Sequence, residues 1–293
     1  MEKVRKNKLA LTIFLFPALF LFLAILIAPI IMSFVYSFFD WNGQTEWTFV
    51  GLKNYIEIFT NKSVQFNKSL GNAIILAILS VLIQLPLALL LALLLARKVK
   101  GEGFFVTVFF IPVILSTVVI GQLWSKIYHP DYGILNLILN SLGLKELARA
   151  WLGEQGTVLA AVFIPILWQY VGYHMLLMYA GVKTISPEIQ EAAKIDGATN
   201  WQTEWYVVIP MLKPVLRMCT IFAVTGSLKA FDLIYVLTGG GPNHASEVPS
   251  ISMVEMFFSR NRYGMGSAIG IFIILLCFFF AFLIQKCIRV EGE

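Results

Sequence analysis

Six long apolar runs, separated by shorter polar segments, limit this chain to one class of fold. The first, Leu9–Phe39, contains no charged residue, and the others cover residues 70–96, 104–128, 158–181, 215–237 and 266–288. A helix needs roughly 20 predominantly apolar residues to cross the hydrocarbon core of a bilayer, and each run is long enough. The first run is also too long for the apolar core of a signal peptide. We therefore predict an all-α integral membrane protein, a single domain over residues 9–288 with six transmembrane helices.

The basic residues are distributed unevenly between the two sides of this predicted domain. Of the 22 lysines and arginines, 13 lie in the N-terminal tip (residues 1–8), the loop after the second run, the region around residues 182–214 and the C-terminus. Eight lie in the alternating segments, and Lys229 lies inside a run. Because short cytoplasmic segments carry the excess of basic residues, the tip, residues 182–214 and the tail (residues 289–293) are predicted to be cytoplasmic. The charge pattern is that of a multi-pass protein of the cell membrane, and nucleic acid is not expected as a partner.

The sequence contains no motif typical of a metal site, a nucleotide-binding site or a catalytic site. The three cysteines have no metal-ligand spacing. The glycines at 239–241 lack the lysine that would follow in a nucleotide-binding loop. No paired carboxylates, His–Glu metal motif or nucleophile elbow occurs within the runs. We expect no catalytic residue, no metal and no cofactor in this chain, and a membrane enzyme has the least support.

The polar segment between the fourth and fifth runs (residues 182–214) carries signals for a first short helix. Ser186 is a good N-cap, Pro187 suits the first helical position, and Glu188 places an acid in the first turn. Gly197 is the expected left-handed residue after the helix.

A second short helix follows at once. Thr199 and Gln202 have the spacing of a capping box. We expect this helix to end before Pro210 and Pro214, because proline supplies no donor and restricts the residue before it. Two capped helices about a tight glycine form a rigid hairpin. Local chemistry alone leaves it equally open that the hairpin is an ordinary connection between spans.

The hairpin resembles the EAA loop of ABC-importer permease subunits. The string EAAKIDGA (residues 191–198) and the later Ile209-Pro210 are typical of the carbohydrate-uptake type, that is, of maltose-type and glycerol-phosphate-type permeases. The string FDLIYVLTGGGP (residues 231–242) resembles the first permease subunit of such pairs. The family usually has proline where this chain has Ser186. The resemblance implies the type I ABC-importer permease fold with a cytoplasmic two-helix coupling hairpin.

In that family the loop docks on a cytoplasmic ATPase and transmits its closure to the membrane domain. The resemblance therefore implies as partners a second homologous permease, two ATP-binding subunits that hold ATP and magnesium, an extracytoplasmic sugar-binding protein and the sugar itself. The residues that it assigns to ATPase coupling are Glu191, Ala192, Ala193, Asp196, Gly197, Ala198, Trp201 and Gln202.

Polar groups in the fourth run indicate where a substrate would pass. Gln169 and Tyr173 are four residues apart with Tyr170 beside them, so one helix face presents an amide and two phenols. Aromatic rings with hydrogen-bonding tips suit a sugar, although an interfacial belt or a helix-packing face explains the same pattern. The resemblance to maltose-type permeases favours a pocket and implies these substrate-binding residues: Thr117, Gln169, Tyr170, Tyr173, Ser227 and Ala230.

Three further ionisable residues lie within the runs. Lys229 and Asp232 are three residues apart on the expected fifth helix, where they could form an ion pair that fixes helix register; a substrate contact is equally open. His174 is expected to hydrogen-bond between helices rather than to relay protons.

We predict a permease subunit of an ATP-driven importer for a sugar, and an oligosaccharide in particular. Neutral polar groups with aromatics, and the absence of an arginine cluster from the runs, favour a neutral solute. One alternative is the same architecture for another solute, such as glycerol phosphate or a polyamine. Another is an ion-coupled secondary transporter, although these often show internal repeats and this sequence has none.

Overall fold

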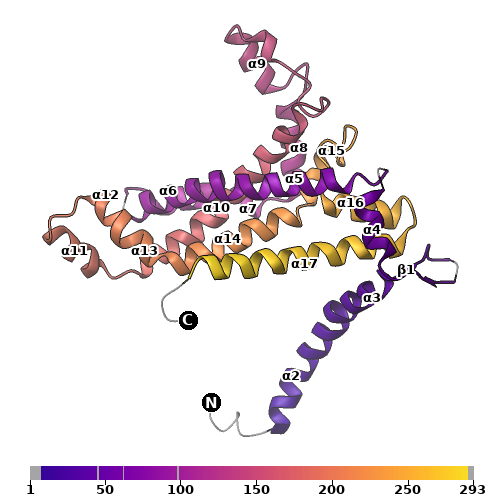
Figure 1. Cartoon of the computed structure of the whole chain (residues 1–293). Coiled ribbons are helices and arrows are strands. Elements are labelled where there is room, and N and C mark those ends of the chain that lie inside the picture. Colours follow the sequence, from indigo (N-terminus) through magenta and orange to yellow (C-terminus); the bar gives the residue numbers. More distant parts are fainter. Residues whose placement is uncertain (1–7, 45, 62, 98, 290–293) are drawn as a thin grey trace. The chain divides into compact units, whose positions relative to one another are not determined.

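The computed structural model describes residues 8–289 except 45, 62 and 98, and it is almost entirely helical (Figure 1). The chain forms two compact units. Unit 1 comprises Met1–Val64 and Ser252–Ile274, and unit 2 comprises Gln65–Ile251 and Leu275–Glu293. The predicted cytoplasmic tip and tail lie outside the described residues, apart from Lys8 and Arg289.

Unit 1 begins with the first apolar run. It forms α2 (Lys8–Phe22), η1 (Leu23–Ile27) and α3 (Ala28–Tyr36). The part Ile13–Tyr36 is long and apolar enough to cross a membrane, and its most apolar window buries none of its residues within the chain. The polar loop after it forms a two-stranded antiparallel hairpin of β1 (Phe39–Asp40) and β2 (Thr48–Phe49), followed by α4 (Lys53–Thr60).

The segment after the fifth run contains a further helix, α16 (Pro249–Phe258), and residues 245–252 are all buried. The last helix, α17 (Tyr263–Cys287), packs closely on α16 within unit 1. A Cβ on Gly266 would lie 2.9 Å from the Phe257 ring, so the glycine is what allows this approach. Ile251 and Met256 of α16 are therefore buried, whereas Phe258 at its end is exposed.

Unit 2 holds the core of the membrane domain. The second run forms one 31-residue span from α5 (Phe66–Leu79), η2 (Ser80–Gln84) and α6 (Leu85–Ala96). The fourth run is a single 27-residue helix, α10 (Val158–Thr184), which packs against α6, α7 (Glu102–Ile114) and α14 (Lys213–Leu228). Figure 1 shows the span formed by α5 and α6 running alongside α10 and α14. Between the third and fourth runs lie α9 (Ile134–Ser141) and the short turn η3 (Lys145–Leu147).

Three wide turns of π-helix interrupt the helices, and a proline follows each of them. In η1, η2 and η4 (Glu204–Val208) the residue after the turn donates to a carbonyl five residues back rather than four. The next residue is Pro29, Pro86 or Pro210 in turn. Proline offers no N–H and crowds the preceding turn of a regular helix, so the wider turn allows the helix to continue past it.

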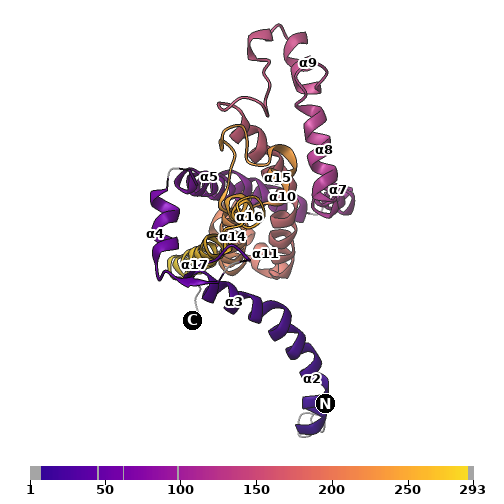
Figure 2. The same cartoon turned by 90° about the vertical axis from the view of Figure 1, so that its right-hand side faces the viewer.

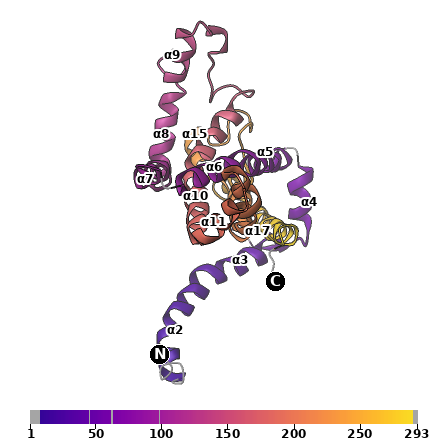
Figure 3. The same ribbon diagram turned by 90° about the vertical axis from the view of Figure 1, so that its left-hand side faces the viewer.

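The third run was predicted to be one helix over residues 104–128, and this was wrong. It forms α7 and α8 (Thr117–Ile127), whose axes differ by 95°. Leu115 and Ser116 between them have extended backbone. Pro112 removes one backbone donor shortly before the break. Figures 2 and 3 show the consequence, because α7 is seen end-on where α8 is seen from the side.

The fifth run is also interrupted. It was expected to be continuous over residues 215–237, but α14 ends at Leu228 and α15 (Asp232–Thr238) begins four residues later. Phe231, with φ −146° and ψ −63°, is outside the helical region. Both interruptions lie in unit 2, and α15 packs against α8.

Candidate functional site

The first helix of the polar hairpin forms as its caps predict. In α11 (Pro187–Ile195), Ser186 is the N-cap and its Oγ accepts a hydrogen bond from the backbone N–H of Glu188 at 3.4 Å. Gly197 has φ +87°, and the N–H groups of Gly197 and Ala198 donate to carbonyls of the preceding turn at 3.1 and 3.0 Å. This pair of bonds is the Schellman motif, which satisfies carbonyls at the helix end.

The second helix begins as predicted and ends later than predicted. At α12 (Asn200–Thr203) the Thr199 Oγ1 accepts from the N–H of Gln202, and the Gln202 side chain accepts from the N–H of Thr199, so the capping box is complete. The helix does not end before Pro210. It continues through η4 and α13 (Ile209–Met211), because the π-turn accommodates the proline.

The base of the hairpin is held firmly to the rest of unit 2. Five buried apolar residues from α6, the end of α10 and the returning chain pack together: Leu93, Val182, Ile185, Val208 and Leu212. Beside them, Arg97 Nε lies 3.1 Å from Glu204 Oε1, and the Glu204 side chain is only 11% exposed. The ion pair joins the end of the second span to the second helix of the hairpin.

The tip of the hairpin, by contrast, exposes large apolar side chains. Ile195 is 86% exposed, Trp201 58%, Trp205 53% and Tyr206 79%. The two tryptophan rings meet edge to face. Figure 3 views the bundle from this end. A firmly held segment with an exposed apolar surface is suited to binding another protein.

A cavity of about 520 Å³ lies in unit 2 at the level where the helices break. Residues of η2, α8, α10, α14 and α15 line it. Thr117 is the first residue of α8 after one break, and Lys229–Phe231 form the other break. Non-helical backbone is tolerated at membrane depth where it is buried in protein or lines a cavity. Both breaks therefore open on the same polar space.

All six residues predicted to bind substrate line this cavity, although they come from three separate helices and a break. They are Thr117, Gln169, Tyr170, Tyr173, Ser227 and Ala230. Gln169 and Ser227 are buried, whereas Tyr170 is 42% exposed. Phe222 and Phe231 add aromatic surface.

The ion pair that Lys229 and Asp232 could have formed is not seen among the described residues, and the break in the fifth span is the reason. Lys229 is the first residue of the interruption and Asp232 begins the next helix, so the two do not occupy neighbouring turns of one helix. Among the described residues they form no ion pair with each other, and both are exposed and line the cavity. In the described part of the chain, the cavity thus contains one positive and one negative group without an ion-pair partner.

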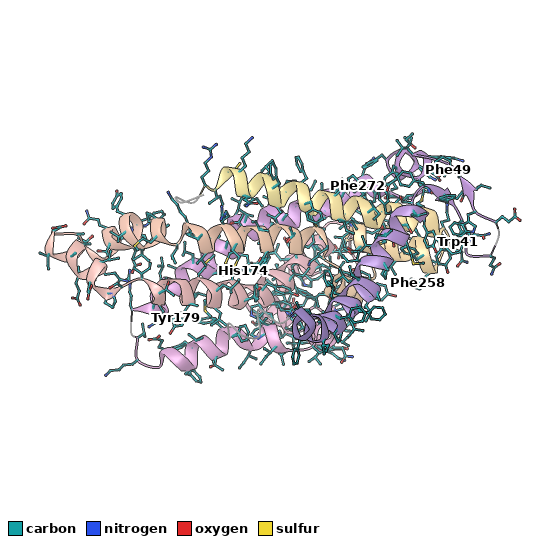
Figure 4. All side chains as sticks on the ribbon, turned by 90° about the horizontal axis from the view of Figure 1, so that it is seen from below. Trp41, Phe49, His174, Tyr179, Phe258 and Phe272 are labelled. Carbon is teal, nitrogen blue, oxygen red and sulfur yellow. The ribbon has the colours of Figure 1, made fainter. Side chains whose placement is uncertain are left out.

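His174 also departs from its expected role, which was a hydrogen bond between helices. It lines the same cavity, and its ring meets Tyr173 edge to face. Its Nδ1 is buried and has no hydrogen-bond partner in the described part of the chain, so the expected bond to another helix is not formed there. Figure 4 shows His174 midway along α10, with Tyr179 nearer the hairpin.

Two of the buried polar residues that line the cavity were not predicted. Ser80 and Gln84 are the first and last residues of η2, and both are buried against the cavity. The Ser80 and Ser227 hydroxyls lie 3.1 Å apart. The available signal was a polar residue in an otherwise leucine-rich run, since such residues are costly in lipid and usually face protein or water.

Comparison with known proteins identifies this arrangement. The family described as the inner membrane component of binding-protein-dependent transport systems matches residues 84–288. The chain belongs to this family. This permease is therefore a multi-pass inner membrane protein and the membrane component of an ABC transporter; it is not the ATPase, and ATP is bound by a partner subunit.

Several characterised or named relatives are similar over most of their length. The permease is 36% identical to "Probable ABC transporter permease protein YurN" of Bacillus subtilis, covering 99% of each chain. It is 34% identical to "Multiple sugar-binding transport system permease protein MsmF" of Streptococcus mutans, covering 85% of this chain and 84% of the relative. Against "Trehalose/maltose transport system permease protein MalF" of Thermococcus litoralis the identity is 33%, over 96% and 94%.

A solved structure supports the fold of the permease. A chain of a bacterial ABC transporter involved in import of the acidic polysaccharide alginate matches with a TM-score of 0.85, over 100% of this chain and 99% of that one. The identity is 22%, so the match concerns the fold alone. The predicted all-α permease fold is confirmed, and the ion-coupled secondary transporter and the membrane enzyme are excluded by the family.

Proposed function

We propose that this permease is one of two membrane-spanning subunits of an ATP-driven importer that translocates a sugar, and specifically an oligosaccharide. The observation that carries the proposal is the cavity at the two helix breaks. It offers amide, phenol and hydroxyl groups beside aromatic rings, and no arginine lines it. Rings that stack on C–H faces, with hydroxyl and amide partners at their edges, suit a neutral polyhydroxylated ligand.

The relatives support the same solute class. Those named for multiple sugars and for trehalose and maltose are each more than 30% identical to this chain over more than four fifths of it. A cavity of about 520 Å³ is within the usual range for small-molecule sites, so it accommodates a short sugar.

Transport on this proposal is driven from the hairpin. The ATPase subunits dock on the exposed face that includes Glu191, Ala192, Trp201 and Gln202. Asp196 and Gly197 set the turn between the two helices. Ala193 and Ala198 pack behind the exposed face. Both termini and the hairpin lie in the cytoplasm, and a sugar-loaded binding protein delivers the solute from the other side. Because the base of the hairpin is firmly packed, closure of the ATPases moves the ends of the second, fourth and fifth spans together.

One observation favours a second candidate. Lys229 lies in the cavity without an ion-pair partner among the described residues and could balance an anion such as glycerol phosphate. Asp232, equally unpaired, argues against a strong preference for anions and is the group that a polyamine would need.

The test is co-purification followed by transport. The tagged permease is isolated from its host in mild detergent, and the copurifying permease, ATPase and binding protein are identified by mass spectrometry. The complex is then reconstituted in vesicles with ATP on the ATPase side. Uptake of maltose, trehalose or diacetylchitobiose, little affected by Lys229→Met, supports the proposal. Uptake only of glycerol phosphate or spermidine, lost in Lys229→Met or Asp232→Asn respectively, would replace it.

A further inference from the structure

We infer that the second membrane span supplies a direct substrate contact, in which the Gln84 side-chain amide donates a hydrogen bond to a hydroxyl oxygen of the sugar. This inference rests on the proposed function and extends it to a span that the sequence did not implicate. Gln84 is the last residue of the π-turn η2, lines the cavity and is 2% exposed. Wide turns of this kind recur at functional sites in helices.

The two polar ends of the turn differ in how they are satisfied. Ser80, at the first position, lies 3.1 Å from the Ser227 hydroxyl. The Gln84 Nε2 is buried and has no hydrogen-bond partner among the described residues. A buried donor without a partner costs free energy, and most buried polar groups avoid that cost. A hydrogen-bond acceptor on the substrate explains why the Gln84 amide is buried without a partner in the protein.

The surroundings of Gln84 show that it does not lie on the membrane-facing side of its helix. Leu82 and Ile83, on the same turn, are 67% and 51% exposed and present the apolar surface expected of a membrane face. Gln84 instead lines the cavity, and both α10 and α14 pack against η2. The amide therefore lies on the bundle side of the span.

The ligand chemistry follows from the groups that lack partners. Gln84 Nε2 can only donate, so it needs an acceptor. His174 Nδ1, in the same cavity, is also buried without a partner and donates or accepts according to its tautomer. A hydroxyl both accepts and donates, so neighbouring hydroxyls of one sugar ring meet both groups. A neutral sugar suits this cavity better than an anionic ligand, because an anion would add a second negative charge to the cavity that already contains Asp232.

The experiment compares the reconstituted wild-type complex with Gln84→Leu, which keeps a similar volume and removes the donor. The probes are maltose, trehalose, diacetylchitobiose and the deoxy analogues of whichever is transported. We expect Gln84→Leu to raise the KM about 5–10-fold, the loss expected for one neutral hydrogen bond. Recovery of the complex stays unchanged. The thermal midpoint of the variant is no lower than that of wild type, because the substitution removes an amide that has no partner among the described residues.

The deoxy analogues and a matched variant separate a contact from a structural effect. With the wild-type complex, one deoxy analogue should have a higher KM than the parent sugar. With Gln84→Leu, the same analogue and the parent sugar should have equal KM values. Ile83→Leu, on the outward side of the same turn, should behave as wild type. An unchanged KM in Gln84→Leu, or an equal additional loss of affinity with every analogue, overturns the inference and leaves the proposed function standing. If no sugar stimulates the wild-type complex, the proposed function fails first and the inference fails with it.

Discussion

Gly197 shows how much one residue decides at the tip of the hairpin. Its φ of +87° closes the Schellman motif, and nothing lies within 4 Å of the position where a Cβ would stand. The requirement is therefore for backbone conformation and not for space. An L-residue in this region costs about 1–2 kcal/mol, and a β-branched side chain is especially unfavourable there.

Replacing this glycine should uncouple the transporter. We expect Gly197→Val to leave membrane insertion intact but to lower transport per ATP hydrolysed by about tenfold, because the turn between α11 and α12 changes direction. The ratio of sugar uptake to ATP hydrolysis in vesicles measures this. Gly71→Ala, at a helical glycine with open space around it, is the matched control. A Gly197→Val complex with normal coupling would refute the role of the turn.

A second residue-scale prediction concerns Glu57 in unit 1. Arg262 donates two hydrogen bonds to its carboxylate, at 2.7 and 2.9 Å, and these hold the pKa of Glu57 below its usual value. A depressed folded pKa means that the stabilisation is complete above the unfolded pKa, about 4.3, and is lost as the pH falls through the folded value.

Unit 1 should therefore open locally in acid. Hydrogen exchange of α4 is expected to be constant between about pH 5 and 8 and to accelerate below about pH 4, after correction for the intrinsic rate. Glu57→Gln should show the faster exchange already at neutral pH. Identical exchange in the two proteins at neutral pH would show that the pair contributes little.

At the scale of elements, the second span connects the two functional regions. Its π-turn lines the cavity through Ser80 and Gln84, and the chain just beyond its end pairs with the hairpin through Arg97 and Glu204. Glu204 is mostly buried, and removing one partner of a buried pair leaves the other charge uncompensated.

A charge exchange tests this connection. Arg97→Glu and Glu204→Arg should each reduce ATP-driven uptake at least tenfold, and the double variant should recover a large part of it. Basal ATP hydrolysis in the purified complex reports whether the ATPase still docks. The pair Arg149 and Glu154, more exposed and remote from the hairpin, is the control. If the double variant is as defective as the singles, pairing is not the basis of the effect.

The cavity can also be tested by filling it. Ala230 lies at the break between α14 and α15 and lines the cavity. Ala230→Trp should abolish uptake while leaving basal ATP hydrolysis and complex recovery unchanged, because the bulk occupies the substrate space. Gly226→Ala is a small change in the same wall and should have a weak effect. Normal uptake in Ala230→Trp would place the substrate path elsewhere.

The elements also show what sequence reasoning reaches and what it does not. The caps at Ser186, Gly197 and Thr199 were predictable because their hydrogen bonds are local. The breaks after Ile114 and Leu228 were not, because what tolerates an extended residue in a span is the packing of other helices around it. Gln84 was overlooked for the same reason: its importance depends on which helices face it.

At the scale of the whole molecule, the proposed topology predicts on which side of the membrane each loop lies. With the three native cysteines replaced, a cysteine at Trp201 in the hairpin should react with a membrane-impermeant maleimide only from the cytoplasmic side. A cysteine at Leu142, 67% exposed beyond α9, should react only from the opposite side. The measurement compares labelling of intact cells with that of inverted vesicles. Labelling of both positions from one side would refute the six-span topology.

The wide turns before Pro29, Pro86 and Pro210 have a consequence for how the faces of these helices are assigned. Each turn adds one residue to its helix, which shifts the angular phase of everything after it by about 100°. A helical wheel drawn through residues 66–96 without a restart after Gln84 rotates the residues of α6 onto the wrong faces. Lipid-facing and bundle-facing positions in this permease are therefore to be counted separately on either side of each turn.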